Sequence, residues 1–404
     1  MKLRSILFWL HLSAGVLAGI VILLMCVTGV VLGYEHQILR WSLQEYRSIP
    51  PSPDARRLSS GALLANARAA HAEKVPATIA IASDPLEPVS VGFGRDLTVY
   101  LNPYTGAVLG EGSKGLQSFF LTAEYLHRWI AAKGDWRATG RLITGLSNFL
   151  FAVLVLSGPF LWWPRDWRPA VVRSVAFFKR GLSGRARDFN WHNTIGIWCA
   201  VPLALIVLSA VVMSFPWAND LLFRLSGSPP PPRATGPGPG GNVQRPAGGQ
   251  RRQGASSDLT RDNLDALWAR AEQQVPGWHT ITLRVPNSSD SAAAFTIDSG
   301  DGGHPDKRGT LTLDVKTTDV VRWEPWASLN RGRQMRAWVR FGHTGEAGGF
   351  WGETIAVIAS LGGAFLVWTG LSLALRRLFR WSAARFEPAV TQEAVAVAQG
   401  DDQS

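Results

Sequence analysis

The sequence contains four long stretches that carry no Asp, Glu, Lys or Arg. They are Ile6–Tyr34, Leu142–Trp163, Trp191–Ala218 and Thr354–Leu375. A helix needs roughly 20 residues to cross the hydrocarbon core of a bilayer, and each stretch is that long. Because every backbone polar group must be paired inside lipid, these runs predict helices. The first is longer than the roughly 7–15 apolar residues of a cleavable signal peptide, so we expect a retained anchor.

The distribution of positive charge predicts how the helices cross. The net charge is +11, but the basic residues gather in short segments beside the spans, which argues against nucleic-acid binding. Short loops rich in Lys and Arg stay in the cytoplasm. The basic residues are Arg165, Arg168, Arg173, Lys179, Arg180, Arg185 and Arg187 in the loop after the second span, and Arg376, Arg377 and Arg380 after the fourth. We expect a multi-pass protein of a bacterial inner membrane, with both termini in the cytoplasm and both long connections in the periplasm.

The two long connections resemble each other. The first predicts a helix over Ser60–Glu73 and then strands at Ala77–Ala82, Val89–Phe93 and Leu97–Leu101. The second predicts a helix over Leu259–Val275 and then strands at His279–Val285, Ala292–Ile297, Thr310–Asp314 and Asp319–Trp323. Each set fits a small α+β domain in which one helix covers one side of a sheet.

Four of the eight histidines lie at matching positions of the two halves. His11 and His192 open the first and third spans, whereas His127 and His343 shortly precede the second and fourth. The separations are 127 − 11 = 116 and 343 − 192 = 151 positions, a difference of 35. That difference is close to the length of the Pro/Gly-rich segment Ser226–Ser257, which we expect to be a disordered insert. The chain therefore reads as a parallel duplication with its axis along the membrane normal.

The predicted topology sorts these histidines into two pairs. His11 and His192 would lie at the cytoplasmic face, and His127 and His343 at the periplasmic face. Two imidazoles on facing helices can hold a haem iron from both sides. The sequence has no Cys-x-x-Cys-His attachment site, so each group would be a haem b. Ionisable residues inside spans are costly and are candidates for function.

Other interpretations of the histidines remain open. Any one of them could simply anchor a helix at the membrane interface. Zinc is disfavoured because a structural zinc site takes four protein ligands. His36, at the outer end of the first span, could be a spare ligand, a substrate contact or an interfacial anchor; His71, His279 and His304 are expected on the surface.

Several short motifs, in this order, resemble the PepSY-associated transmembrane family of iron-regulated inner-membrane proteins. They are Trp9-Leu10-His11, Leu126-His127-Arg128, Ser157-Gly158, Leu161-Trp162-Trp163-Pro164, Trp191-His192-Asn193-Thr194-Ile195-Gly196, Gly342-His343-Thr344-Gly345 and Trp368-Thr369-Gly370. The resemblance implies a ferric-siderophore reductase with two haems, held by His11 with His192 and by His127 with His343. It implies electron flow from a cytoplasmic reductase or a quinol to a ferric siderophore in the periplasm.

The resemblance completes the predicted organisation, a four-helix transmembrane bundle with two small α+β, PepSY-like periplasmic domains. The predicted segments are 1–36, span one; 37–117, the first periplasmic domain; 118–164, an interfacial helix and span two; 165–190, the basic loop; 191–218, span three; 219–258, the insert; 259–328, the second periplasmic domain; 329–380, an interfacial segment and span four; and 381–404, a cytoplasmic tail. The alternative function is a non-redox, membrane-anchored module that binds or inhibits a periplasmic peptidase. In that case the histidines would be interface anchors and the protein colourless.

Overall fold

In the computed structural model, the described residues are 3–94, 97–164, 166–232, 261–286 and 290–386. The chain divides into two compact units, described separately below. Unit 1 comprises Met1–Val27, Leu146–Ala204 and Ala359–Ser404, and unit 2 comprises Thr28–Gly145 and Leu205–Ile358. Most of the predicted Pro/Gly-rich insert, residues 233–260, lies outside the described residues.

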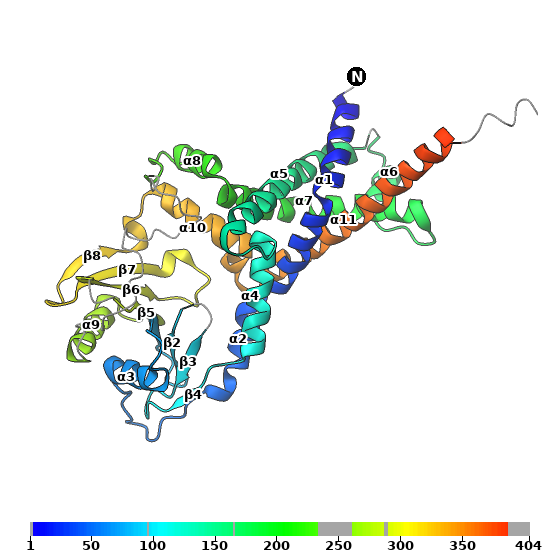
Figure 1. Ribbon diagram of the computed structural model, residues 1–404. Helices are drawn as coiled ribbons and strands as arrows, with labels where there is room; N and C mark the ends of the chain where they lie inside the picture. Colours follow the sequence, from blue (N-terminus) through cyan, green and yellow to red (C-terminus); the bar gives the residue numbers. More distant parts are fainter. Residues whose placement is uncertain (1–2, 95–96, 165, 233–260, 287–289, 387–404) are drawn as a thin grey trace, which may run out of the picture. The chain divides into compact units, whose positions relative to one another are not determined.

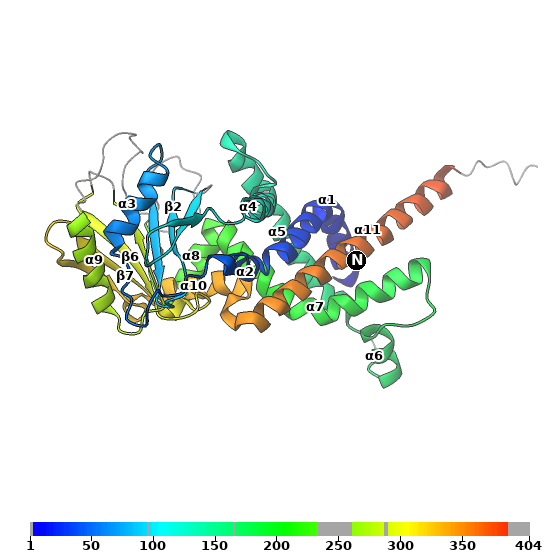
Figure 2. The same ribbon diagram turned by 90° about the horizontal axis from the view of Figure 1, so that it is seen from below.

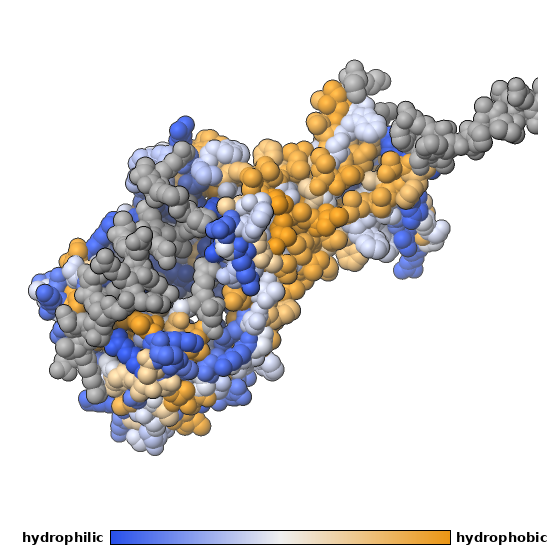
Figure 3. All heavy atoms as spheres, viewed as in Figure 1, coloured by the Kyte–Doolittle hydropathy of each residue, from blue (hydrophilic) through white to orange (hydrophobic). Residues whose placement is uncertain are grey.

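Long apolar helices match the four predicted spans. They are α1 (Leu3–Leu32), α5 (Arg137–Trp162), α7 (Gly184–Ser214) and α11 (Gly349–Phe386). Within the described ranges, four segments are long and apolar enough to cross a membrane: Leu3–Tyr46, Gly134–Trp162, Gly184–Ser214 and Glu346–Arg380. Apolar surface gathers over these helices (Figure 3). The prediction of a multi-pass membrane protein is confirmed, although α7 begins before the predicted Trp191 and so includes charged residues.

Glycines in α11 allow the helices of unit 1 to approach closely. A Cβ added at Gly363 would lie 2.8 Å from Sγ of Cys26 in α1, and one added at Gly362 would lie 2.5 Å from Sγ of Cys199 in α7. Small residues at such crossings bring helix backbones together in membranes. Both cysteines therefore act as small packing residues against α11.

Unit 2 contains an eight-stranded antiparallel sheet of order β4-β3-β2-β1-β5-β6-β7-β8 (Figure 1). The first four strands are β1 (Thr78–Ala82), β2 (Val89–Gly92), β3 (Thr98–Leu101) and β4 (Val108–Gly110). The last four are β5 (Thr280–Arg284), β6 (Ala292–Asp298), β7 (Arg308–Asp314) and β8 (Val320–Glu324). The sequence predicted seven of these strands and missed the three-residue β4.

The two repeats share this sheet, in which β1 pairs with β5. Ala80, the middle residue of β1, lies opposite Thr282, the middle residue of β5. Helices α3 (Ser60–Ala70) and α9 (Arg261–Gln274) cover the same face (Figure 2). Leu63 of α3, Leu264 of α9 and the inward residues of both strand sets form one hydrophobic core. Instead of one sheet per repeat, the structure has a continuous sheet with a local two-fold relationship at its centre.

Shorter helices flank the long ones. They are α2 (Glu35–Ser42), α4 (Lys114–Trp129), α6 (Pro169–Ala176), α8 (Pro216–Leu225) and α10 (Arg331–Thr344). Single 3-10 turns lie at Gln44–Tyr46, Gly134–Trp136, Pro305–Lys307, Trp326–Ser328 and Glu346–Gly348. Helices α4 and α10 precede the second and fourth spans and occupy equivalent places in the two repeats.

Candidate metal centres

The first predicted pair meets inside unit 1. His11 is the ninth residue of α1 and His192 the ninth of α7, counting from Leu3 and Gly184. Their imidazole ring centres lie 6.3 Å apart with an angle of 81° between the ring planes. Equivalent helices of the two repeats thus bring together two histidines that are far apart in the sequence.

The second predicted pair meets inside unit 2. His127 lies near the end of α4 and His343 near the end of α10, with ring centres 6.4 Å apart at 60°. Left-handed backbone ends both helices, at Ile130 and at Gly345 (φ 83°). A Cβ at Gly345 would lie 2.5 Å from the carbonyl oxygen of Gly352, so glycine is required for this turn. The turn fixes His343 beside the start of α11.

A hydroxyl contacts Nδ1 of each paired histidine in unit 1. Nδ1 of His11 lies 2.8 Å from Oγ of Ser157, and Nδ1 of His192 lies 3.0 Å from Oγ1 of Thr369. The Ser157 hydroxyl donates to the Val153 carbonyl at 2.6 Å, so its single proton is used there. It therefore accepts from Nδ1–H, which leaves a lone pair on Nε2 of His11. Thr369 donates likewise, to the Phe365 carbonyl at 2.8 Å.

Unit 2 repeats this arrangement. Nδ1 of His127 lies 3.0 Å from Oγ1 of Thr28, and Nδ1 of His343 lies 3.1 Å from Oγ of Ser209. Nδ1 of His343 also donates to the Ile206 carbonyl at 2.9 Å, and because a carbonyl only accepts, the proton is on Nδ1. Burial lowers the pKa of His343, and the Ile206 bond partly offsets this. The imidazole is therefore neutral at pH 7, as a metal ligand must be.

The four hydroxyls follow the duplication. Each histidine–hydroxyl contact joins two helices of the same repeat, whereas each histidine–histidine approach joins the two repeats. The sequence analysis names Ser157 and Thr369 only within motifs of the family resemblance, and it does not single out Thr28 or Ser209. Their contacts with Nδ1 are the part of the sites that the sequence did not predict.

The geometry of the pairs fits a metal held between two imidazoles. With metal–nitrogen bonds of about 2.0–2.1 Å, two imidazoles on opposite sides of one ion would have ring centres roughly 6–6.5 Å apart. The observed 6.3 and 6.4 Å lie in this range. In the part of the chain that the structure describes, no cluster of three or more His, Cys, Asp or Glu is arranged to hold a metal ion. A donor set of two neutral imidazoles is the one that a six-coordinate haem iron takes from a protein.

Glycines lie directly beside both imidazoles of the unit 1 pair, where a larger side chain would crowd the rings. A Cβ at Gly370 would lie 3.3 Å from Cε1 of His192, and one at Gly158 would lie 3.9 Å from Cε1 of His11. Each glycine directly follows the hydroxyl residue that contacts the same histidine. The residues present at this pair therefore fit a porphyrin.

A buried carboxylate that the sequence assigned to the basic loop supports the unit 1 site. Asp188 lies in α7, one helical turn before His192, and is 2% exposed. It accepts a hydrogen bond from Ser372 at 2.8 Å and lies 3.3 Å from the guanidinium of Arg376. Ser372 lies two residues after Gly370 in α11. The contact between Asp188 and Ser372 therefore holds α7 against α11 close to the place where His192 contacts Thr369.

The remaining histidines lie apart from both pairs. His36 is exposed, and its Nε2 lies 4.0 Å from Oε1 of Glu346. His71, His279 and His304, expected on the surface, are half-buried in unit 2. His71 faces Glu73 and Glu111, and His304 faces Asp306. None of these four has a paired histidine among the contacts of the described residues.

Four spanning helices, an antiparallel sheet and two facing histidine pairs define a multi-pass membrane protein built by duplication. Comparison with protein families then places it. The family model described as PepSY-associated TM region matches residues 8–377, and the chain belongs to this family. The predicted resemblance is confirmed at the level of the family. No curated protein matches the sequence closely enough to count as a relative.

Proposed function

We propose that this protein is a di-haem oxidoreductase of the bacterial inner membrane that passes electrons across the bilayer and reduces a ferric siderophore in the periplasm. His11 with His192 would hold one haem b, and His127 with His343 the other. A bound haem supplies one-electron chemistry at iron. The observation that carries the proposal is the spacing of the two imidazole pairs, 6.3 and 6.4 Å between ring centres.

The protein's own residues prepare each site for this role. Ser157 and Thr369 fix the tautomers of His11 and His192, so that Nε2 of each ring carries the lone pair. His11 and His192 lie in helices that are long and apolar enough to span a bilayer, and His127 and His343 lie in the helices α4 and α10, which precede the other two spans. Reduction of the substrate, Fe³⁺ + e⁻ → Fe²⁺, needs no acid or base from the protein, and hard oxygen ligands hold the ferrous ion less tightly. The electron donor would be a cytoplasmic reductase or a quinol.

The orientation is part of the proposal. The arginine-rich segments around α6 and after Leu375 favour a cytoplasmic location for the His11–His192 end. The sheet of unit 2 and the His127–His343 pair would then face the periplasm, where ferric chelates arrive. Both termini would be cytoplasmic.

An absorption spectrum of the purified full-length chain tests the proposal. We expect a Soret band, sharp α bands on reduction, and two haems per chain by the pyridine haemochrome assay. A colourless, folded protein from haem-replete cells would contradict the proposal. It would favour the alternative, a non-redox module that binds or inhibits a periplasmic peptidase.

A further inference from the structure

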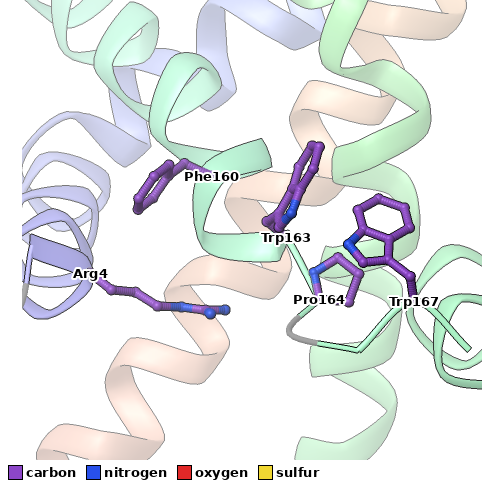
Figure 4. A pocket seen from close by; sticks show the side chains of 5 residues that line it. All are labelled: Arg4, Phe160, Trp163, Pro164 and Trp167. Carbon is purple, nitrogen blue, oxygen red and sulfur yellow. The ribbon is translucent and has the colours of Figure 1, made fainter.

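An open hollow lies at the end of α5 in unit 1 (Figure 4). It has a volume of about 600 Å³ and is lined by Arg4, Phe160, Trp163, Pro164 and Trp167. The aromatic rings come from the end of α5 and the segment after it, and the guanidinium reaches across from α1. Among the described residues, its lining consists of three aromatic side chains, one proline and one cation, with no carboxylate.

The hollow lies along the same two helices as the His11 site. Arg4 precedes His11 by seven residues in α1, which is two helical turns, or roughly 10 Å of rise. Phe160 and Trp163 follow Ser157, the partner of His11, by three and six residues along the chain. A molecule in the hollow would therefore lie within a short electron-transfer distance of the His11–His192 pair.

Arg4 is positioned to bind a ligand oxygen. One terminal nitrogen of its guanidinium donates to the Leu161 carbonyl at 2.6 Å, an acceptor in the last turn of α5. Among the described residues, the Arg4 side chain makes this one hydrogen bond. The other N–H groups of the guanidinium are available to donate to a ligand. A guanidinium can hydrogen-bond a ring oxygen and also stack on an aromatic face.

The aromatic residues favour a flat ligand that arrives from the lipid. Phe160, in the last turns of the spanning helix α5, is 46% exposed, and Trp163, directly after the helix, is 58% exposed. The rings of Trp163 and Trp167 lie edge to face with centres 4.9 Å apart. Stacking surfaces with one convergent polar group are typical of sites for apolar cofactors. A lipid-soluble hydroquinone has the required flat ring, polar oxygens and apolar tail.

We propose that this hollow binds a membrane quinol and is the point at which electrons enter the protein, an inference that rests on the proposed function. The reaction balances as QH₂ + 2 Fe³⁺ → Q + 2 H⁺ + 2 Fe²⁺, where Q is the quinone and the ferric ions belong to the siderophore substrate. Two electrons leave one quinol, and each reduces one ferric ion. The two protons are released to the aqueous solvent.

Photolabelling of the full-length protein in phosphatidylcholine nanodiscs with an azido-quinone tests the inference. We expect saturable labelling of peptides containing Phe160 to Trp167. Arg4→Gln and Trp163→Leu should each weaken labelling about tenfold, the effect of losing one well-formed contact. Arg380→Gln and Trp351→Leu, which change an exposed Arg and an exposed Trp outside the hollow, should label like the wild type.

The outcomes separate this inference from the function on which it rests. Labelling elsewhere, or undiminished labelling of Arg4→Gln, overturns the quinol site while the haem spectrum leaves the di-haem proposal standing. Displacement of the label by phosphatidylglycerol would identify a site for anionic lipid instead. Loss of one haem in Arg4→Gln would assign Arg4 to the porphyrin carboxylates and also overturn the inference. Absence of haem from the wild type would contradict the proposed function itself.

Discussion

Ser157 accepts a hydrogen bond from Nδ1 of His11 at 2.8 Å while its own proton is committed to the Val153 carbonyl. This arrangement favours the tautomer of His11 that carries its proton on Nδ1 and its lone pair on Nε2. Thr369, whose hydroxyl donates to the Phe365 carbonyl, favours the same tautomer of His192. The hydroxyls act through the histidines and are positioning residues.

Replacing Ser157 with Ala should weaken haem binding at the unit 1 site. Loss of a hydrogen-bond partner of a ligating histidine typically costs about 10- to 100-fold in metal affinity. Haem titration of the apoprotein measures this, and the midpoint potential of that haem should shift while the other stays unchanged. Thr369→Ser, which keeps a hydroxyl, is the matched control. Unaltered affinity and potential in Ser157→Ala would show that the hydroxyl has no such role.

Substituting the paired histidines should remove haem by pairs. His11→Ala and His192→Ala are each expected to reduce two haems per chain to one, and the spectrum of the remaining haem should be the same in both variants. His127→Ala and His343→Ala should leave the other haem. His36→Ala, at an exposed histidine, should retain both. If His11→Ala removed both haems from a protein that still folds, the proposed pairing would be wrong.

Enlarging Gly370 should close the unit 1 site selectively. A Cβ added there would lie 3.3 Å from Cε1 of His192, so Gly370→Leu would push against the imidazole that is proposed to hold the haem. We expect loss of one haem, with the haem of His127 and His343 reporting that the protein is folded. Gly115→Leu is the control because nothing lies within 4 Å of an added Cβ at that position. Two haems in Gly370→Leu would place the porphyrin elsewhere.

Removing Asp265 should loosen the joint between the two repeats. Its Oδ1 accepts hydrogen bonds from the Gly61 amide at 2.7 Å and the Ser60 hydroxyl at 3.0 Å, so α9 caps the start of α3. Asp265→Ala is expected to cost about 1–2 kcal/mol, as for a lost helix cap. The loss is measured as a lower midpoint of thermal unfolding followed by circular dichroism. Asp54→Ala, at an exposed position, should leave the midpoint unchanged, and an equal midpoint in Asp265→Ala would contradict the capping role.

The sequence predicted the features that local chemistry determines. Charge-free runs define spans because a single charge in lipid is costly, and the duplication identified His11 with His192 and His127 with His343 as counterparts. The pairing of these residues then required only that the repeats face each other. Element bounds followed from Pro and Gly at turns, to within a few residues.

Contacts between residues far apart in the chain could not be predicted from the sequence. Serine and threonine are common in membrane helices, so nothing marked Ser157 or Thr28 as a partner of a histidine. Asp188 is surrounded by arginines in the sequence, which led to its assignment to the basic loop. The structure shows that α7 begins at Gly184, before the predicted start, and that Asp188 is buried in it. The pairing of β1 with β5 joins strands about 200 positions apart in the sequence, and no local pattern predicts it.

The pairing of Ala80 with Thr282 has an evolutionary consequence. Each is the central residue of its strand, and the histidines likewise approach their own counterparts. These three contacts between the repeats therefore each join a position to its own counterpart. A protein of half this length could make the same sheet and the same two histidine pairs by associating with an identical copy, which points to a self-associating single-repeat ancestor whose two genes became one.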